Sequence, residues 1–249
     1  MLWYKAWLET RSRFLASLSG ITSVIVLFVH HAEYVSRPIG PSGANYLLAL
    51  RRNAGEIYHF GQLYVIALWI LSVILLGMGG LIRERAVGTS SFTLALPVSR
   101  RRLACVRIAV GMLEGICLAV VPWAAILVTT RLGGLPLSFS QAAFYLALLV
   151  SGGLTYFALS VLISSAIEGE YTAPAIAYGL TVFSGIACGS VDAIRPYADL
   201  WRFMSGANHF REGASSLAGP FPWAGALASL SVAAILLFAS VWLIQNREF

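Results

Sequence analysis

The chain has 249 residues, of which 58% are hydrophobic and only 11% are charged, and its mean hydropathy is +0.78. A soluble globular domain carries about 25% charged residues, so this composition excludes water as the main solvent of the protein. The formal net charge of +6 does not indicate nucleic-acid binding, because the basic residues gather at the ends of apolar stretches rather than on one face of a soluble domain. The sequence therefore predicts a membrane protein that binds no nucleic acid.

Six apolar stretches are long enough to cross a bilayer as helices. A helix needs about 20 mainly apolar residues to cross a hydrocarbon layer of about 30 Å, and it then pairs its backbone groups internally. The alternation of apolar and polar residues that a transmembrane β-barrel needs is missing from these stretches. The predicted fold class is an all-α membrane protein with six transmembrane helices, at residues 14–32, 61–82, 103–130, 142–167, 171–190 and 222–244.

The Lys and Arg residues predict the orientation of these helices. If both termini lie on the same side, that side carries 10 of the 17 basic residues, and six of these lie close together in residues 83–107. Dense basic clusters in short loops favour the cytoplasmic side of a membrane. We therefore expect a multi-pass protein of a cell membrane, in bacteria the cytoplasmic membrane, with both termini in the cytoplasm.

Two further segments are expected to lie at the membrane surface. Residues 191–221 interleave charged and apolar side chains, which predicts an outer interfacial or re-entrant helix. Residues 1–13 predict an amphipathic interfacial helix, because they place four apolar side chains on one stripe, namely Leu2, Trp3, Ala6 and Trp7. No repeat or low-complexity linker divides the chain, so we expect one membrane domain over residues 1–249.

Two pairs of glycines have the GxxxG spacing that lets helices approach closely in lipid. The pairs are Gly111 with Gly115 and Gly185 with Gly189. Packing within one subunit is our first interpretation of both pairs. An interface between subunits is the alternative.

The sequence lacks recognisable motifs for catalysis or metal binding. A P-loop needs a Lys that reaches the phosphates, and the only Lys is Lys5, so the chain cannot hydrolyse ATP by the P-loop route. Ser42 follows Gly40 and Pro41 in a turn-rich segment, and the last apolar stretch offers no His as its base. His30 and His31 are adjacent and would point in different directions on a helix. We therefore predict no catalytic, cofactor-binding or metal-binding residue.

Glu114 stands out because it is a carboxylate within a long apolar stretch. It lies about 16 Å along a helix axis from Leu103, which would place it near the middle of the bilayer. A charge there costs at least about 2.5 to 3.5 kcal/mol. We expect Glu114 to be neutral, paired or in contact with water, either as a proton or substrate contact or as a hydrogen-bonded carboxyl between helices.

The segment of residues 83–102 joins the second and third apolar stretches on the predicted cytoplasmic side. Thr89 or Ser90 can cap a short helix, and Pro97 would end it. This helix would present an apolar knob between basic residues, formed by Phe92, Leu94 and Leu96. A knob of this kind needs a groove on a partner.

This segment resembles the corresponding loop of the permease subunits of type-2 ABC transporters. In that family the loop reads approximately as Glu, three residues, Gly-Thr, and later Leu-x-x-Pro-Val-Ser-Arg. The present chain supplies these residues at eight positions, Glu84, Gly88, Thr89, Leu94, Pro97, Val98, Ser99 and Arg100. Only this loop is specific, and the rest of the chain shares the general architecture.

The resemblance implies a permease subunit that pairs with a second permease subunit, as a homodimer or heterodimer, and with two cytoplasmic ATPase subunits that bind ATP-Mg. It implies that residues 1–13 form an elbow helix and residues 83–102 a coupling helix. The expected function is an exporter. The residues expected to couple to the ATPase are Glu84, Gly88, Thr89, Phe92, Leu94, Pro97 and Arg100.

Two other functions remain as alternatives to an ATP-driven exporter. One is a proton-coupled secondary transporter that uses Glu114, and the other is an intramembrane hydrolase. The resemblance carries over no substrate-contacting residue, so lipid-like, peptide, antibiotic and ion substrates all stay open.

Overall fold

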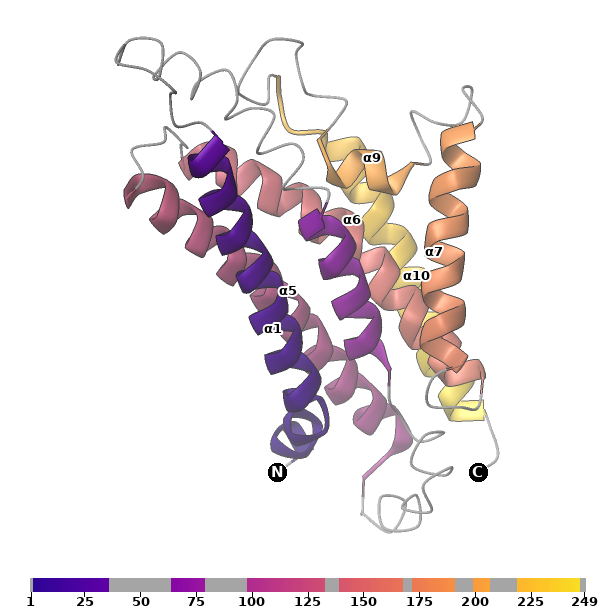
Figure 1. Cartoon of the computed structure of the whole chain (residues 1–249). Coiled ribbons are helices and arrows are strands. Elements are labelled where there is room, and N and C mark those ends of the chain that lie inside the picture. Colours follow the sequence, from indigo (N-terminus) through magenta and orange to yellow (C-terminus); the bar gives the residue numbers. More distant parts are fainter. Residues whose placement is uncertain are drawn as a thin grey trace, which may run out of the picture.

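The structure is a computed structural model, and every regular element in its described part is an α-helix. The long helices are arranged side by side as a bundle (Figure 1). The structure describes residues 2–35, 64–78, 98–132, 139–167, 172–190, 199–206 and 219–246. The helices are α1 (Leu2–Val35), a helix at Tyr64–Gly77, α5 (Arg100–Leu132), α6 (Phe139–Ala166), α7 (Thr172–Ser190), α9 (Leu200–Met204) and α10 (Trp223–Asn246).

These helices confirm the predicted class of an all-α membrane protein. By length and composition, α5, α6 and α10 each contain a segment apolar enough to cross a membrane. The helix at Tyr64–Gly77 and most of α7 are shorter apolar helices. Each of the six predicted stretches overlaps one of the described helices.

The N-terminal helix α1 is longer than either segment predicted there. It runs without a break from Leu2 to Val35, so residues 2–13 and the first apolar stretch form one continuous helix. Its 34 residues correspond to a length of about 51 Å, which exceeds the hydrocarbon thickness of about 30 Å. The helix is therefore long enough to cross the hydrocarbon while its first turns lie at the membrane surface.

Helices α1 and α5 begin at the same end of the bundle, and α10 finishes there (Figure 1). We call this the basic end, because seven basic residues of the described part lie in the first turns of α1 and α5. They are Lys5, Arg11, Arg13, Arg100, Arg101, Arg102 and Arg107. The short helix α9 lies at the opposite end (Figure 1).

The helix at Tyr64–Gly77 packs in the core of the bundle, and Trp69 is its central residue. The Trp69 side chain is fully buried, and its indole Nε1 donates a hydrogen bond to the Gly115 carbonyl of α5 at 3.1 Å. On the α6 side, a Cβ placed on Gly153 would come within 1.7 Å of the indole. The missing side chain at Gly153 therefore makes room for the indole.

Hydroxyl groups on α6 join this helix and α10 to the bundle. Ser160 donates to the Ile74 carbonyl at 2.7 Å, and Ser164 donates to the Gly77 carbonyl at 3.1 Å. On the other side of α6, Thr155 and Ser229 of α10 share a hydrogen bond of 2.7 Å. Such bonds stabilise helix pairs in lipid, where apolar surfaces gain little from leaving the solvent.

The first GxxxG pair packs within the subunit. A Cβ on Gly111 would meet the Phe157 ring at 2.9 Å, and a Cβ on Gly115 would meet Val73 at 3.4 Å. This finding supports the first interpretation of that pair. Gly185 of the second pair has no atom of the described chain within 4 Å of such a Cβ.

The outer segment predicted at residues 191–221 contains α9. Asp199 caps this helix by accepting a hydrogen bond from the Arg202 backbone at 2.9 Å, and Met204 is buried against Gly152 of α6.

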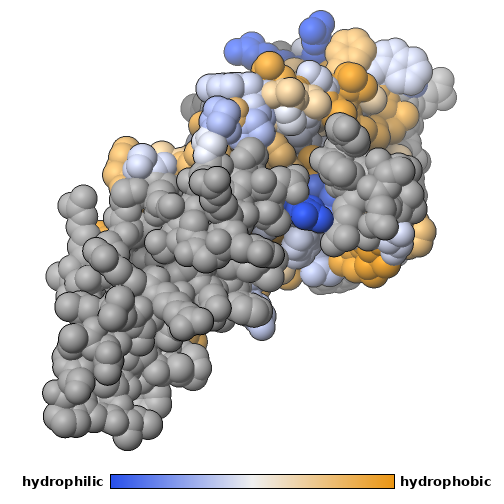
Figure 2. All heavy atoms as spheres, turned by 90° about the horizontal axis from the view of Figure 1, so that it is seen from above, coloured by the Kyte–Doolittle hydropathy of each residue, from blue (hydrophilic) through white to orange (hydrophobic). Residues whose placement is uncertain are grey.

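Seen from the end that carries α9, apolar residues reach the outer edge of the described part (Figure 2). An apolar outer surface is what a bilayer requires.

Candidate functional site

The predicted coupling segment lies mostly outside the described residues. Six of its predicted positions fall there, namely Glu84, Gly88, Thr89, Phe92, Leu94 and Pro97. The seventh, Arg100, is half-buried and begins α5. The structure describes the residues that flank positions 79–97, namely Met78 before them and Val98 after them, and Val98 to Arg102 are the end of the predicted segment.

Arg13 of α1 holds the flank that enters the segment. Its guanidinium Nη1 donates to the Leu75 carbonyl at 3.3 Å and to the Met78 carbonyl at 3.1 Å. The last carbonyls of a helix have no partner within that helix and carry partial negative charge. A cation from α1 therefore caps the end of the helix at Tyr64–Gly77, immediately before the segment.

The other flank is the first turn of α5. The Ser99 hydroxyl accepts a hydrogen bond from the Arg102 backbone at 3.3 Å, which makes Ser99 the cap of this helix. The first turn contains Arg100, Arg101 and Arg102 and no acidic residue. Cations at the start of a helix oppose the helix dipole, so three arginines here favour an anionic partner.

Glu9 of α1 forms an ion pair with α5 near this flank. Its carboxylate Oε2 lies 2.6 Å from Arg107 Nη2, and its Oε1 lies 3.8 Å from Lys5 Nζ. The Arg107 side chain is 16% exposed, so this pair is shielded better than an ordinary surface pair. Helix α1 thus contacts α5 two turns after Arg100.

Glu114 is buried in the interface between α1 and α5. It is 4% exposed, and its Oε1 accepts a hydrogen bond from the Thr10 hydroxyl. Its Oε2 is also buried and has no hydrogen-bond partner among the described residues. This hydrogen bond joins the first three turns of α1 to α5.

These contacts place α1 against both flanks of residues 79–97. Arg13 holds the entering flank, while Glu9 and Thr10 hold the helix that leaves it. In the sequence, Arg13 counts only among the basic residues that predict the orientation, and Glu9 and Thr10 have no assigned role. Polar residues three or four apart on the first turns of α1 were the available signal, but their partners lie 62 to 104 residues away.

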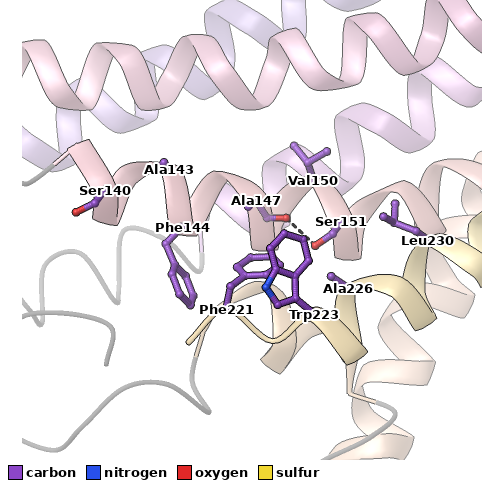
Figure 3. A pocket seen from close by; sticks show the side chains of 10 residues that line it. All are labelled: Ser140, Ala143, Phe144, Ala147, Val150, Ser151, Phe221, Trp223, Ala226 and Leu230. Atoms are coloured by element: carbon purple, nitrogen blue, oxygen red, sulfur yellow. Dashed lines mark hydrogen bonds between the residues drawn. The ribbon is translucent and has the colours of Figure 1, made fainter. Parts of the chain in front are cut away.

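A shallow apolar pocket of about 420 Å³ lies between α6 and α10, near the end that carries α9. Phe144 and Trp223 each make an edge-on contact with the ring of Phe221, and Ser140 and Ser151 supply hydroxyl groups (Figure 3). No charged side chain of the described residues lines it. The lining of this pocket suits an apolar group.

Among the described residues, no group of three His, Cys, Asp or Glu side chains is placed to hold a metal ion. Cys105, Cys117 and Cys188 are free thiols.

Comparison with known proteins agrees with the loop motif. No curated protein matches the chain. The family model described as ABC-2 family transporter protein matches residues 17–211, which is more than half of the chain and includes the whole segment of residues 83–102. With its helical bundle and this match, the chain belongs to the ABC-2 family of transporter proteins.

Proposed function

We propose that this chain is the membrane-spanning permease subunit of an ABC exporter and that separate cytoplasmic ATPase subunits drive it through residues 83–102. The observation that carries the proposal is the family match together with the loop residues Glu84 to Arg100 within it. Lys5 is the only Lys of the sequence, so ATP and Mg²⁺ would bind to the partner.

The contacts of α1 support a mechanical role for this segment. If an ATPase displaces residues 79–97, the displacement reaches the helix at Tyr64–Gly77 and α5 directly, because the two flanks belong to these helices. It also reaches α1 through Arg13, Glu9 and Thr10. Packed helices move as units, so a small shift at the segment would rearrange three helices together.

The proposal includes a second permease subunit, identical or related, in a cell membrane with the basic end in the cytoplasm. Ten of the 17 basic residues lie on that side if both termini do.

The apolar knob of the segment gives the direct test. Replacing buried apolar side chains at the centre of an interface costs about 1 to 4 kcal/mol, whereas exposed ion pairs contribute less than about 1 kcal/mol. We expect Phe92→Ala with Leu94→Ala to release the ATPase from a detergent-purified complex. The matched control, Ser91→Ala with Thr93→Ala, alters neighbouring polar residues and should retain the ATPase.

Co-purification and transport-coupled ATP hydrolysis are the two measurements. If the Phe92 and Leu94 double variant retained the ATPase and undiminished hydrolysis, the segment would not be the coupling surface. If wild-type protein transported substrate with no ATPase present, the ATP-driven function itself would be wrong.

A further inference from the structure

A second pocket, which the proposed function does not use, lies at the basic end between α5 and α10. It is a groove of about 450 Å³. On α5 its lining residues recur every three or four positions and so lie on one face of the helix, and on α10 they do the same. The groove therefore follows the two helices lengthwise.

The two ends of the groove differ in polarity. Arg101 of α5 and Gln245 of α10 line it at the basic end, beside the aromatic ring of Trp242. Farther along the bundle the lining is apolar and includes Met112 and Leu237. One end of the groove therefore carries a cation and an amide, and the rest of the groove is apolar.

The length of the groove matches one leaflet of a bilayer. From Arg101 to Met112 is a distance of about 16 Å along α5, and half of a hydrocarbon core is about 15 Å. An acyl chain whose headgroup lies at Arg101 would therefore end near the middle of the membrane. Trp242 is 58% exposed at the position where aromatic side chains favour the interface.

The positive charge of Arg101 at the basic end of the groove favours an anionic ligand. The side chain of Arg101 forms no ion pair or hydrogen bond with any residue in the described ranges, and it lies in the first turn of α5, where a cation opposes the helix dipole. A phosphate group at Arg101 would be stabilised by the guanidinium and by the start of the helix.

From this charge complementarity and the matching length we infer that the groove binds one anionic phospholipid of the leaflet at the basic end. Its phosphate contacts Arg101 and Gln245, and one acyl chain lies between α5 and α10. Basic pockets between transmembrane helices on the cytoplasmic side commonly bind such headgroups. The apolar pocket of Figure 3 has no cation among its described lining residues and lacks this selectivity. The inference rests on the proposed orientation only for the choice of leaflet.

Native mass spectrometry of the full chain without its ATPase tests the site. The protein is titrated with phosphatidylglycerol or with phosphatidylcholine of the same acyl chains. We expect the first phosphatidylglycerol to bind about fivefold more tightly, and Arg101→Gln to remove this preference. Arg102→Gln is the matched control, because it removes the same charge from the neighbouring residue, which does not line the groove. It should keep the preference.

Two variants that fill the groove complete the test, one on each helix. Ala109→Phe and Val241→Phe should weaken the binding of both lipids, and either one suffices if the other fails to purify as a folded protein. The site is refuted by equal binding of the two lipids to wild type, by an equal loss in Arg101→Gln and Arg102→Gln, or by unchanged binding in a folded filled variant. Displacement of the lipid by millimolar inorganic phosphate would refute a lipid ligand in favour of a free anion. ATPase coupling does not enter these measurements, so the two proposals fail separately.

Discussion

Single residues determine how closely the core helices approach. Trp69 is buried because α6 offers a glycine at its contact point, while its indole nitrogen is satisfied by a backbone carbonyl of α5. The sequence showed Gly153 and Trp69 only as members of apolar stretches. Their contact depends on the rotation of two helices, which composition and spacing do not specify.

Replacing Gly153 by Ala should therefore destabilise the protein, although Ala is intrinsically the better helix former by about 1 kcal/mol. The added Cβ would overlap the Trp69 ring, and overpacking of this kind costs about 1 to 3 kcal/mol or more. Thermal unfolding of purified protein should show a lower midpoint. Gly179→Ala is the control, because a Cβ there meets no described atom within 4 Å, and its midpoint should not fall.

From the sequence, Glu114 is either a proton or substrate contact or a hydrogen-bonded carboxyl between helices. Its burial between α1 and α5 is compatible with both roles. Its partner Thr10 lies 104 residues away and could not be found from the sequence. Since one of its oxygens accepts from a neutral hydroxyl and no described cation lies within ion-pair distance, we expect Glu114→Gln to fold with little loss of stability.

Transport by Glu114→Gln then separates the roles that the sequence left open. Unchanged transport indicates a carboxyl that only joins two helices, and lost transport in a folded protein indicates a proton or substrate contact. Failure of the variant to fold would contradict the expectation itself.

At the scale of elements, α1 links parts of the chain that are far apart in sequence. The amphipathic pattern of residues 1–13 and the apolar stretch after it predicted two segments, because composition changes at Phe14. The helix does not end there, since helical geometry needs no change where the environment changes. Arg13 stands at this transition and caps a second helix.

Arg13→Gln should loosen this link. Charge-assisted hydrogen bonds contribute about 1.5 to 3 kcal/mol, so we expect a lower thermal midpoint and weaker coupling of ATP hydrolysis to transport, with the ATPase still bound. Arg11→Gln is the matched control, since Arg11 is exposed on the same turn of α1, and it should behave as wild type. Equal behaviour of the two variants would show that Arg13 does not position the segment.

At the scale of the whole molecule, the sequence correctly predicted an all-α membrane protein of the ABC-2 family, because apolar length and one loop motif are properties of short segments. It could not predict which helices touch, because nearly uniform apolar stretches do not specify their own rotation. The candidate site also combines a motif that is visible in the sequence with contacts that depend on how the helices pack. Its motif was visible in residues 83–102, whereas the side chains that hold the flanks of this segment were found only in the folded bundle.

The orientation of the bundle is a prediction of the same scale. The even number of predicted crossings places both termini on one side, and the basic cluster of residues 83–107 favours the cytoplasm as that side. A reporter enzyme that is active only outside the cytoplasm should be inactive when fused after Phe249 and active when inserted at Ser42. The opposite pair of results would invert the molecule and assign the lipid groove to the outer leaflet.

The contacts of α1 have a consequence for biosynthesis. A chain enters the membrane from its N-terminus, so Glu9, Thr10 and Arg13 leave the ribosome long before Arg107 and Glu114 are made. An unpaired charged side chain deep in the hydrocarbon would cost about 3 kcal/mol until its partner is made. All three side chains lie within the first 13 residues, where water and lipid headgroups can hydrate them until their partners arrive. Because these side chains lie in the first turns of α1, the helix can be inserted first and form its contacts with the later helices afterwards.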